Sequence, residues 1–289
     1  MIKRRDGTTV HEPNAQDQFL QKMYQSCLGR SIMKVLSIPF FSKFSGWVLT
    51  KSISKICIDP FIRENKIDMS QYESVEYNSF DEFFSRNKKA EFRQVEICDH
   101  QLISPCDSKL LVYPISGKAH FYIKQSFYTL ATLLRDKNLA QKYEEGYALV
   151  FRLTVDNYHR YCYVDNGIQE EIIHIPGFLH SVNPVVNDYL PVYKENSREY
   201  CICHTSSFGT VVAMEVGALM IGQIINHQKS GPFCKGQEKG YFRFGGSTII
   251  LLFQKNTIKI DRDIIHNSLF GIETEVRYGE KIGEALMRQ

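Results

Sequence analysis

A serine preceded by two glycines is the residue of this sequence best suited to unusual chemistry. Residues 235–253 read KGQEKGYFRFGGSTIILLF, so Ser247 follows Gly245 and Gly246 and leads into the apolar run 249–253. That run is too short for an ordinary helix and is rich in β-branched residues, which predicts a buried strand entered through a tight turn. Glycine tolerates unusual φ and ψ angles and leaves its carbonyl unshielded. We interpret this corner as a serine that can attack its own backbone, at the Gly246 carbonyl.

Two other stretches hold residues that could activate such a serine. SPCDS, residues 104–108, places Asp107 in a turn, and DNYHR places Asp156 and His159 between two apolar runs. Taken singly, an aspartate in a turn is usually a cap and a lone histidine is usually structural. Taken together with Ser247, they supply an acid to orient an imidazole, an imidazole to accept a proton and a hydroxyl to attack, which is the logic of an activated nucleophile.

Other chemistries fit these residues less well. A serine hydrolase of the G-x-S-x-G type is disfavoured because Ser247 follows two glycines and precedes Thr-Ile, and a P-loop is disfavoured because no lysine follows the glycines. Cys201, Cys203 and His204 look locally like metal ligands, but no second pair follows at zinc spacing. We therefore predict buried thiols there and no metal site.

The elements that must position these residues change character near residue 95. From residue 96 the sequence alternates short apolar runs with turn residues, which predicts strands. Asp165-Asn166-Gly167 predicts a hairpin turn, and residues 126–143 predict one helix. The predicted strands are Lys109–Val112, Ala148–Val155, His159–Val164, Gln169–Ile175, Tyr200–His204, Gly209–Glu215 and Thr248–Phe253.

The first 95 residues read as helical after a polar start. Residues 1–13 predict a mobile arm, residues 14–28 an amphipathic helix, and Ser79 with Glu82 a capping box that opens a short helix. Residues 30–58 combine lysines and arginine with phenylalanine and tryptophan, contain no acid, and have no charge-free stretch long enough to span a membrane. This segment alone fits a helix in a membrane interface and a helical hairpin packed on the protein's own core equally well.

Composition sets the broad class. The 289 residues are 43% hydrophobic, enough for a substantial core, and the net charge of +3 does not indicate nucleic acid as a partner. No apolar stretch follows the basic N-terminus, which predicts no secretory signal, and eight scattered cysteines favour reduced thiols in a cytosolic compartment. The predicted fold class is α+β, with a helical N-terminal layer (1–95) on a mainly antiparallel β catalytic domain (96–289).

In the same order along the chain, five motifs resemble the phosphatidylserine decarboxylase family. They are SPCDS (104–108), DNYHR (156–160), SVNP (181–184), KGQEKGYFRFGGST (235–248) and EVRYGEKIG (275–283). FDEFFSR (80–86) is also similar to the helical segment with which members of this family begin their conserved part. The resemblance spans the chain from about residue 75 to its end, and is far more specific than the GGST corner alone.

This resemblance implies a self-processing enzyme. Ser247 would attack the Gly246 carbonyl and split the chain into residues 1–246 (β chain) and 247–289 (α chain), which remain together as a heterodimer. Ser247 would become a pyruvoyl group that replaces any external cofactor. The implied activity is that of a carboxy-lyase converting phosphatidylserine to phosphatidylethanolamine and CO2.

The resemblance also implies a relay of an aspartate, a histidine and a serine for self-cleavage, in which Asp107 and Ser247 are the matching positions. In the family the first histidine, here His159, serves decarboxylation and a second one is assigned to the self-cleavage relay, and at this second position the chain departs from its relatives. Relatives often carry a second histidine three residues after the first, where this chain has Cys162. Either His159 serves both tasks, or His180 substitutes, or the thiol takes part. We favour His159, because a thiol is a poor replacement for an imidazole near neutral pH.

A decarboxylase acting on a lipid headgroup must reach the bilayer, so the resemblance favours the membrane-interface interpretation of residues 30–58. It implies phosphatidylserine in a membrane as partner, a peripheral location on the cytoplasmic face, and leaves homo-oligomers open. Two alternatives stay open beside it. One is a pyruvoyl-dependent decarboxylase of another amino acid or serine-headgroup lipid, and the other is a lipid-binding homologue that does not cleave itself.

Overall fold

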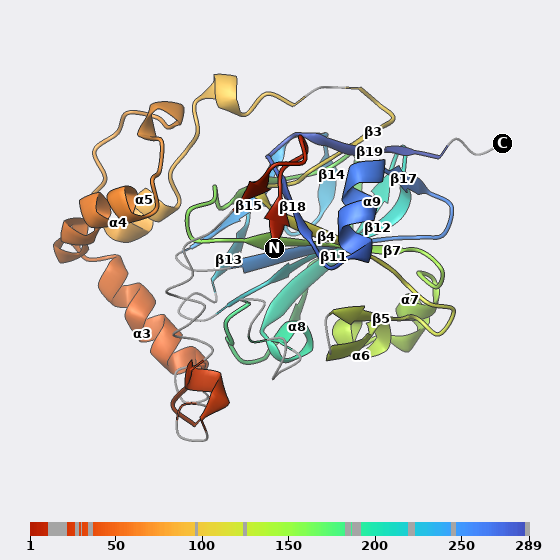
Figure 1. Ribbon diagram of the computed structural model, residues 1–289, viewed down its shortest axis with the longest axis horizontal. Helices are drawn as coiled ribbons and strands as arrows, with labels where there is room; N and C mark the ends of the chain where they lie inside the picture. Colours follow the sequence, from red (N-terminus) through yellow and green to blue (C-terminus); the bar gives the residue numbers. More distant parts are fainter. Residues whose placement is uncertain are drawn as a thin grey trace.

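A large, mostly antiparallel sheet carries the strand that begins at Ser247 (Figure 1). The computed structural model describes residues 1–10, 22–26, 29, 31–33, 37–95, 98–123, 126–182, 186, 192–218, 223–243 and 247–286. Along the sheet the strands follow the order β14 (Gly231–Phe233), β9 (Gly167–Gln169), β11 (Arg198–Thr205), β12 (Gly209–Val216), β16 (Ser247–Phe253), β7 (Tyr147–Leu153), β4 (Ser108–Pro114), β18 (Glu273–Val276), β1 (Ile2–Lys3) and β2 (Thr9–Val10). β10 (Ile173–Ile175) pairs with β11 beside this path, and β1 runs parallel to β18.

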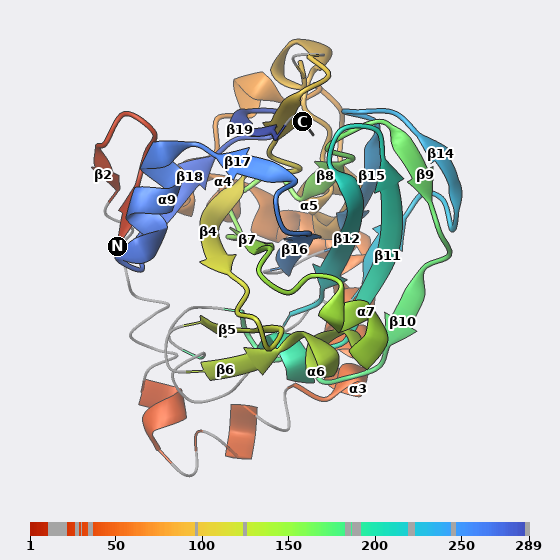
Figure 2. The same ribbon diagram turned by 90° about the vertical axis from the view of Figure 1, so that its right-hand side faces the viewer.

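Three smaller sheets surround the large one. Their orders are β13 (Ile224–Asn226), β15 (Glu238–Phe242), β8 (Arg160–Cys162); β17 (Ile258–Ile260), β19 (Lys281–Ala285), β3 (Gln101–Ile103); and β5 (His120–Ile123) with β6 (Ser126–Thr129). In Figure 2, β5, β6 and the short helices α6 (Leu130–Leu134) and α7 (Lys137–Gln141) lie together, while α9 (Arg262–Leu269) lies against β4 and β18. The sheet of β13, β15 and β8 matters most here, because β8 directly follows His159.

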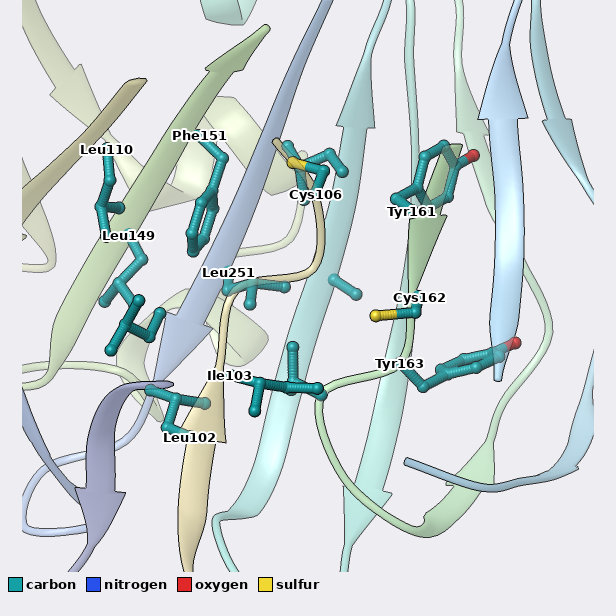
Figure 3. Close-up of a cluster of buried hydrophobic side chains, with 14 of the residues drawn as sticks. Leu102, Ile103, Cys106, Leu110, Leu149, Phe151, Tyr161, Cys162, Tyr163 and Leu251 are labelled. Carbon is teal, nitrogen blue, oxygen red and sulfur yellow. The ribbon is translucent and has the colours of Figure 1, made fainter. Parts of the chain in front are cut away.

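Both faces of the large sheet are buried at β16, which explains the unbroken apolar run of this strand. Successive side chains of a strand point to opposite faces. Ile249 and Leu251 join one core cluster with Phe151 and Cys162, part of which is drawn in Figure 3, whereas Ile250 and Leu252 join a second cluster on the opposite face. A strand with two buried faces reads as continuously hydrophobic rather than alternating.

The helical layer lies at one side of the sheets, in orange in Figure 1. α5 (Phe80–Phe84) begins as the capping box predicts, since Ser79 Oγ accepts a hydrogen bond from the Glu82 N–H at 3.3 Å. Its phenylalanines form a separate cluster with residues of the neighbouring helices. The other helical elements are α3 (Pro39–Leu49), η1 (Ser52–Cys57), α4 (Ile58–Glu64), η2 (Met69–Gln71), η3 (Ala90–Phe92) and α8 (Val192–Glu195). No described helix is long and apolar enough to cross a membrane.

The mixed composition of helices and mostly antiparallel sheets confirms the coarse fold class. The mobile arm is wrong: Ile2 is buried, β1 and β2 extend the large sheet, and Arg5 forms ion pairs with Asp261 at 2.8 Å and with Asp263. Glu280 is a third carboxylate near Arg5. The N-terminal segment is polar in sequence, but buried Ile2 and these ion pairs hold it against the sheet. The predicted helix 14–28 falls mostly outside the described residues.

Three local predictions are also corrected. The segment predicted as one helix, residues 126–143, begins as strand β6 and then forms two short helices separated at Arg135, whose φ of 53° is left-handed. The strand predicted over 169–175 is two strands, β9 and β10. Asp165-Asn166-Gly167 makes a turn but not a hairpin, because β8 pairs with β15 while β9 pairs with β11 and β14.

Candidate active site

Ser247 is the first residue of β16 and is buried, with 1% of its surface exposed. It lies opposite Leu153, the last residue of β7. Strand alternation puts its side chain on the face of Ile249 and Leu251, which is the face that carries the Cys162 cluster. Within the described part of the chain its Oγ atom has no hydrogen-bond partner. Gly245 and Gly246 lie outside the described residues, so the bond expected to be cleaved is not described.

His159 reaches the same end of the sheet because the turn that bears it begins directly after β7. Thr154 N–H donates to Asn157 Oδ1 at 2.9 Å and closes that turn. The imidazole is 1% exposed, and its Nδ1 lies 2.9 Å from the Asn157 carbonyl oxygen. A carbonyl oxygen only accepts, so Nδ1 carries the proton and Nε2 of the neutral ring holds the lone pair. Nε2 is therefore the atom suited to accept a proton.

Two further contacts fix the His159 ring and its backbone. The ring of Phe84 on α5 lies 4.3 Å from the imidazole, centroid to centroid. The N–H of Phe242 in β15 donates to the His159 carbonyl oxygen at 3.0 Å. The small sheet and the helical layer thus both determine where the imidazole lies.

Asp107 lies in the turn before β4, and other groups occupy both of its carboxylate oxygens. Oδ2 forms an ion pair with Lys88 Nζ at 2.5 Å, and Oδ1 accepts the Tyr278 N–H at 2.8 Å. The turn itself is attached to β8, since Cys162 N–H donates to the Pro105 carbonyl oxygen at 2.9 Å. The described contacts therefore bring Asp107 to the neighbourhood of β8 but not onto the imidazole.

Cys162, which stands where relatives often have histidine, is a core residue of β8. Only 3% of its surface is exposed, and burial raises the pKa of its thiol to about 12. A thiol with such a pKa stays protonated near neutral pH and accepts no proton. Its environment favours a packing role.

His180 is buried in the loop after β10, and one asparagine holds its backbone. Asn196 Oδ1 accepts the His180 N–H at 2.9 Å, and Asn196 Nδ2 donates to the carbonyl oxygens of His180 and Gly217 at 2.8 Å each. Gly217 follows Val216, which pairs with Thr248. His180 thus lies near the same end of the large sheet as Ser247, with its Nε2 at 3.4 Å from Glu195 Oε2.

Sequence reasoning missed the contribution of residues 81–88 to this site. This segment was predicted only to open a short helix, yet Phe84 contacts His159, Lys88 binds Asp107, and Asp81 forms an ion pair with Arg243 at 2.6 Å. Arg243 stands four residues before Ser247. No local sequence pattern predicts these contacts, because the two residues of each contact are far apart in the sequence.

The residues considered as metal ligands do not converge. Cys201 and Cys203 lie in the core with their sulfur atoms 3.7 Å apart, whereas His204 is exposed and lies 2.6 Å from Glu170. In the described chain no group of three or more His, Cys, Asp or Glu side chains could hold a metal ion.

Comparison with known proteins agrees with the motifs. The family described as phosphatidylserine decarboxylase matches residues 80–284. Phosphatidylserine decarboxylase proenzyme 2 of Clostridium acetobutylicum is 48% identical over 266 residues, covering 92% of this chain and 91% of that protein. The phosphatidylserine decarboxylase proenzyme of Clostridium botulinum strain 657 is 42% identical over 98% of this chain and 99% of its own length. That of Desulfitobacterium hafniense strain Y51 is 38% identical over 98% of both.

Proposed function

The chain belongs to the phosphatidylserine decarboxylase family, and on this premise we propose that it makes its own catalytic group by self-cleavage between Gly246 and Ser247. It is a carboxy-lyase that converts phosphatidylserine to phosphatidylethanolamine and CO2. We propose, beyond this activity, the position of the cleavage site, the pyruvoyl group and the residues that produce it.

The buried Ser247 hydroxyl is the observation that carries the proposal. Its Oγ lies in an apolar part of the sheet and, among the described residues, bonds to nothing. An unsatisfied buried hydroxyl costs stability, which is expected of a group retained for reaction rather than for packing. These surroundings fit a pyruvoyl group formed from Ser247, which would supply an electrophilic carbonyl that takes up the electrons released with CO2.

The surrounding residues are assigned from their contacts. His159 Nε2 accepts the proton of the Ser247 hydroxyl, while the Asn157 carbonyl holds the required tautomer and Phe84 holds the ring. Asp107 joins the relay as the family resemblance implies. Lys88, which pairs with Asp107, places its Nζ 5.1 Å from the ring centroid of Tyr158, the residue before His159.

The test is the covalent state of the purified protein. Cleavage leaves 289 − 246 = 43 residues in the small fragment, which intact mass measurement detects and a carbonyl-reactive probe labels. Ser247→Ala should give one uncleaved chain with no labelled fragment, and Ser206→Ala, at an exposed serine, serves as control. A wild-type protein that stays uncleaved yet decarboxylates would overturn the proposal.

We place the membrane contact of this enzyme on α3 and η1. Phe40, Phe44 and Trp47 recur at helical spacing and expose 57–70% of their surface, and Ile53 and Ile56 expose more than 70%. Such a patch of large apolar side chains marks an interaction surface.

Charge indicates which surface this patch meets. Lys51 Nζ lies 4.5 Å from the Trp47 ring centroid, and residues 30–58 contain no acid. Because phosphatidylserine is anionic, basic residues beside an apolar face favour a bilayer that contains it. We therefore propose peripheral attachment to the cytoplasmic face of a membrane.

A further inference from the structure

An ion pair lies inside the apolar cluster on the Ser247 face of the large sheet. Lys239 Nζ of β15 is 2.8 Å from Glu215 Oε1 of β12, and the two side chains are 4% and 1% exposed. Lys239 Nζ also donates to Asn226 Oδ1 at 2.8 Å. Burial raises the pKa of Glu215, and Lys239 opposes this shift. The other carboxylate oxygen, Oε2, is buried and has no partner within the described residues.

Core stability alone does not account for this pair. Removing two charges from water costs free energy that their attraction only partly offsets, and apolar replacements of a buried pair are often as stable or more stable. On this face Cys201, Ala213 and Ile249 are apolar, whereas Glu199, which pairs with Glu215 across β11 and β12, is half-buried and accepts a hydrogen bond from Asn226 Nδ2 at 3.0 Å. The role of the ion pair is therefore better judged from the two strands that it connects than from the core volume that it occupies.

Glu215 belongs to the part of the large sheet that holds Ser247. It pairs directly with Ile249 of β16, and Ser247 stands two residues before Ile249 on the same face. Such diagonal positions on neighbouring strands are about 7–8 Å apart, within reach of a long side chain. A buried carboxylate thus stands next to the reacting serine on its own face.

Lys239 belongs to the small sheet that holds His159. Tyr241 of β15 pairs with Arg160 of β8, and the Phe242 N–H donates to the His159 carbonyl oxygen. Lys239 therefore lies on a strand whose backbone is hydrogen-bonded to the segment that carries His159. Glu215 likewise lies on β12, which pairs with β16, the strand that carries Ser247. The ion pair therefore joins the sheet that holds Ser247 to the sheet that holds His159.

We propose that Glu215 and Lys239 are positioning residues for self-cleavage, which set the approach of His159 to Ser247; this inference rests on the proposed function. As the Ser247 oxygen bonds to the preceding carbonyl carbon, its proton moves to His159 Nε2. The proton then passes to the departing amide nitrogen as the C–N bond breaks, leaving an ester. One proton is moved and returned, no oxidant is needed, and the step depends on the spacing between the two sheets.

A double variant separates positioning from packing. The variant that combines Glu215→Leu and Lys239→Met lacks both charges, and its melting temperature should be no lower than that of the wild type. We expect its 43-residue fragment to appear about 100-fold more slowly, the scale of loss for an ångström-size misplacement of reacting groups. The matched control is Arg152→Met with Glu273→Leu, which removes a buried pair on the opposite face of the sheet and should leave the cleavage rate within a few-fold.

A conservative variant and a chemical probe complete the test. Glu215→Gln with Lys239→Gln keeps a neutral hydrogen bond between the sheets and should cleave clearly faster than the Leu/Met double variant. Hydroxylamine cleaves esters, so it should not accelerate the Leu/Met variant, in which formation of the ester is the slow step.

Three outcomes overturn the inference. In the first, a folded Leu/Met variant cleaves itself at the wild-type rate. In the second, the Gln/Gln variant cleaves no faster than the Leu/Met variant, and in the third, hydroxylamine restores cleavage of the Leu/Met variant. If the wild type itself fails to cleave, the proposed function fails instead.

Discussion

His159 and Cys162 lie three residues apart, and their surroundings assign them opposite properties. His159 has its Nδ1 at a carbonyl oxygen and its Nε2 suited to accept a proton, whereas the Cys162 thiol is held neutral by burial. We expect Cys162→Ala to cleave itself within a few-fold of the wild-type rate and His159→Ala to stay uncleaved, as seen on a denaturing gel. His180→Ala is the matched histidine control and should still cleave. Full processing of His159→Ala would remove it from the relay.

The sequence was enough to propose the reacting groups but not the groups that contact them. Two glycines and an apolar run mark Ser247 locally, and the family resemblance adds Asp107 and, as the histidine we favour, His159 as proposed relay residues. Lys88 and Glu215 could not be predicted, because each acquires its meaning from a partner on another element. In the sequence Lys88 is an ordinary lysine in a polar stretch, and Glu215 is an unexpected charge in an apolar strand. Only the fold shows that Lys88 pairs with Asp107 and Glu215 with Lys239.

At the scale of elements, the long strands and the short strand β8 were predictable, whereas β13 and β15 were not. β7, β11, β12 and β16 each have seven or eight residues and dense apolar patterns, so their positions agree with prediction to within about two residues. β13, β15 and β8 have three to five residues and exist because they pair with one another. The sequence therefore predicted the strand that follows His159 but not β15, the strand that pairs with it and binds the His159 carbonyl oxygen.

The exposed face of α3 makes a prediction about membrane binding. Phe44→Ser with Trp47→Ser removes two stacked aromatic side chains that we expect to enter the lipid interface. At about 1.5 kcal/mol for each side chain, binding to vesicles containing phosphatidylserine should fall roughly 100-fold. Co-sedimentation at low salt measures this, with Phe270→Ser as control at an aromatic residue that is more exposed than either. Equal binding by the double variant and the wild type would place the membrane contact elsewhere.

For the whole molecule, buried thiols and phenols predict loss of stability at alkaline pH. Burial raises the pKa of Cys162 to about 12 and raises those of Cys106 and Tyr161 well above their usual values. Above about pH 9 the unfolded chain releases these protons while the folded chain keeps them, so stability falls as pH rises, by about 1.4 kcal/mol per pH unit and group. Urea midpoints at pH 8 and pH 10.5 should differ accordingly, and Cys162→Ala should reduce the difference. Equal midpoints would contradict the prediction.

The cleaved protein should remain one folded unit, because the fragment beginning at Ser247 is interleaved with the rest. Its first strand, β16, pairs with β12 on one side and β7 on the other, and its later strands β18 and β19 pair with β4 and β3. Removing β16 would expose two strand edges and divide both core clusters, a far larger cost than one broken peptide bond. We therefore expect the 43-residue fragment to co-elute with the large chain in native size-exclusion chromatography and to separate only in denaturant. Release of the fragment without denaturant would mean that the strand holding the reactive end is not anchored by its neighbours.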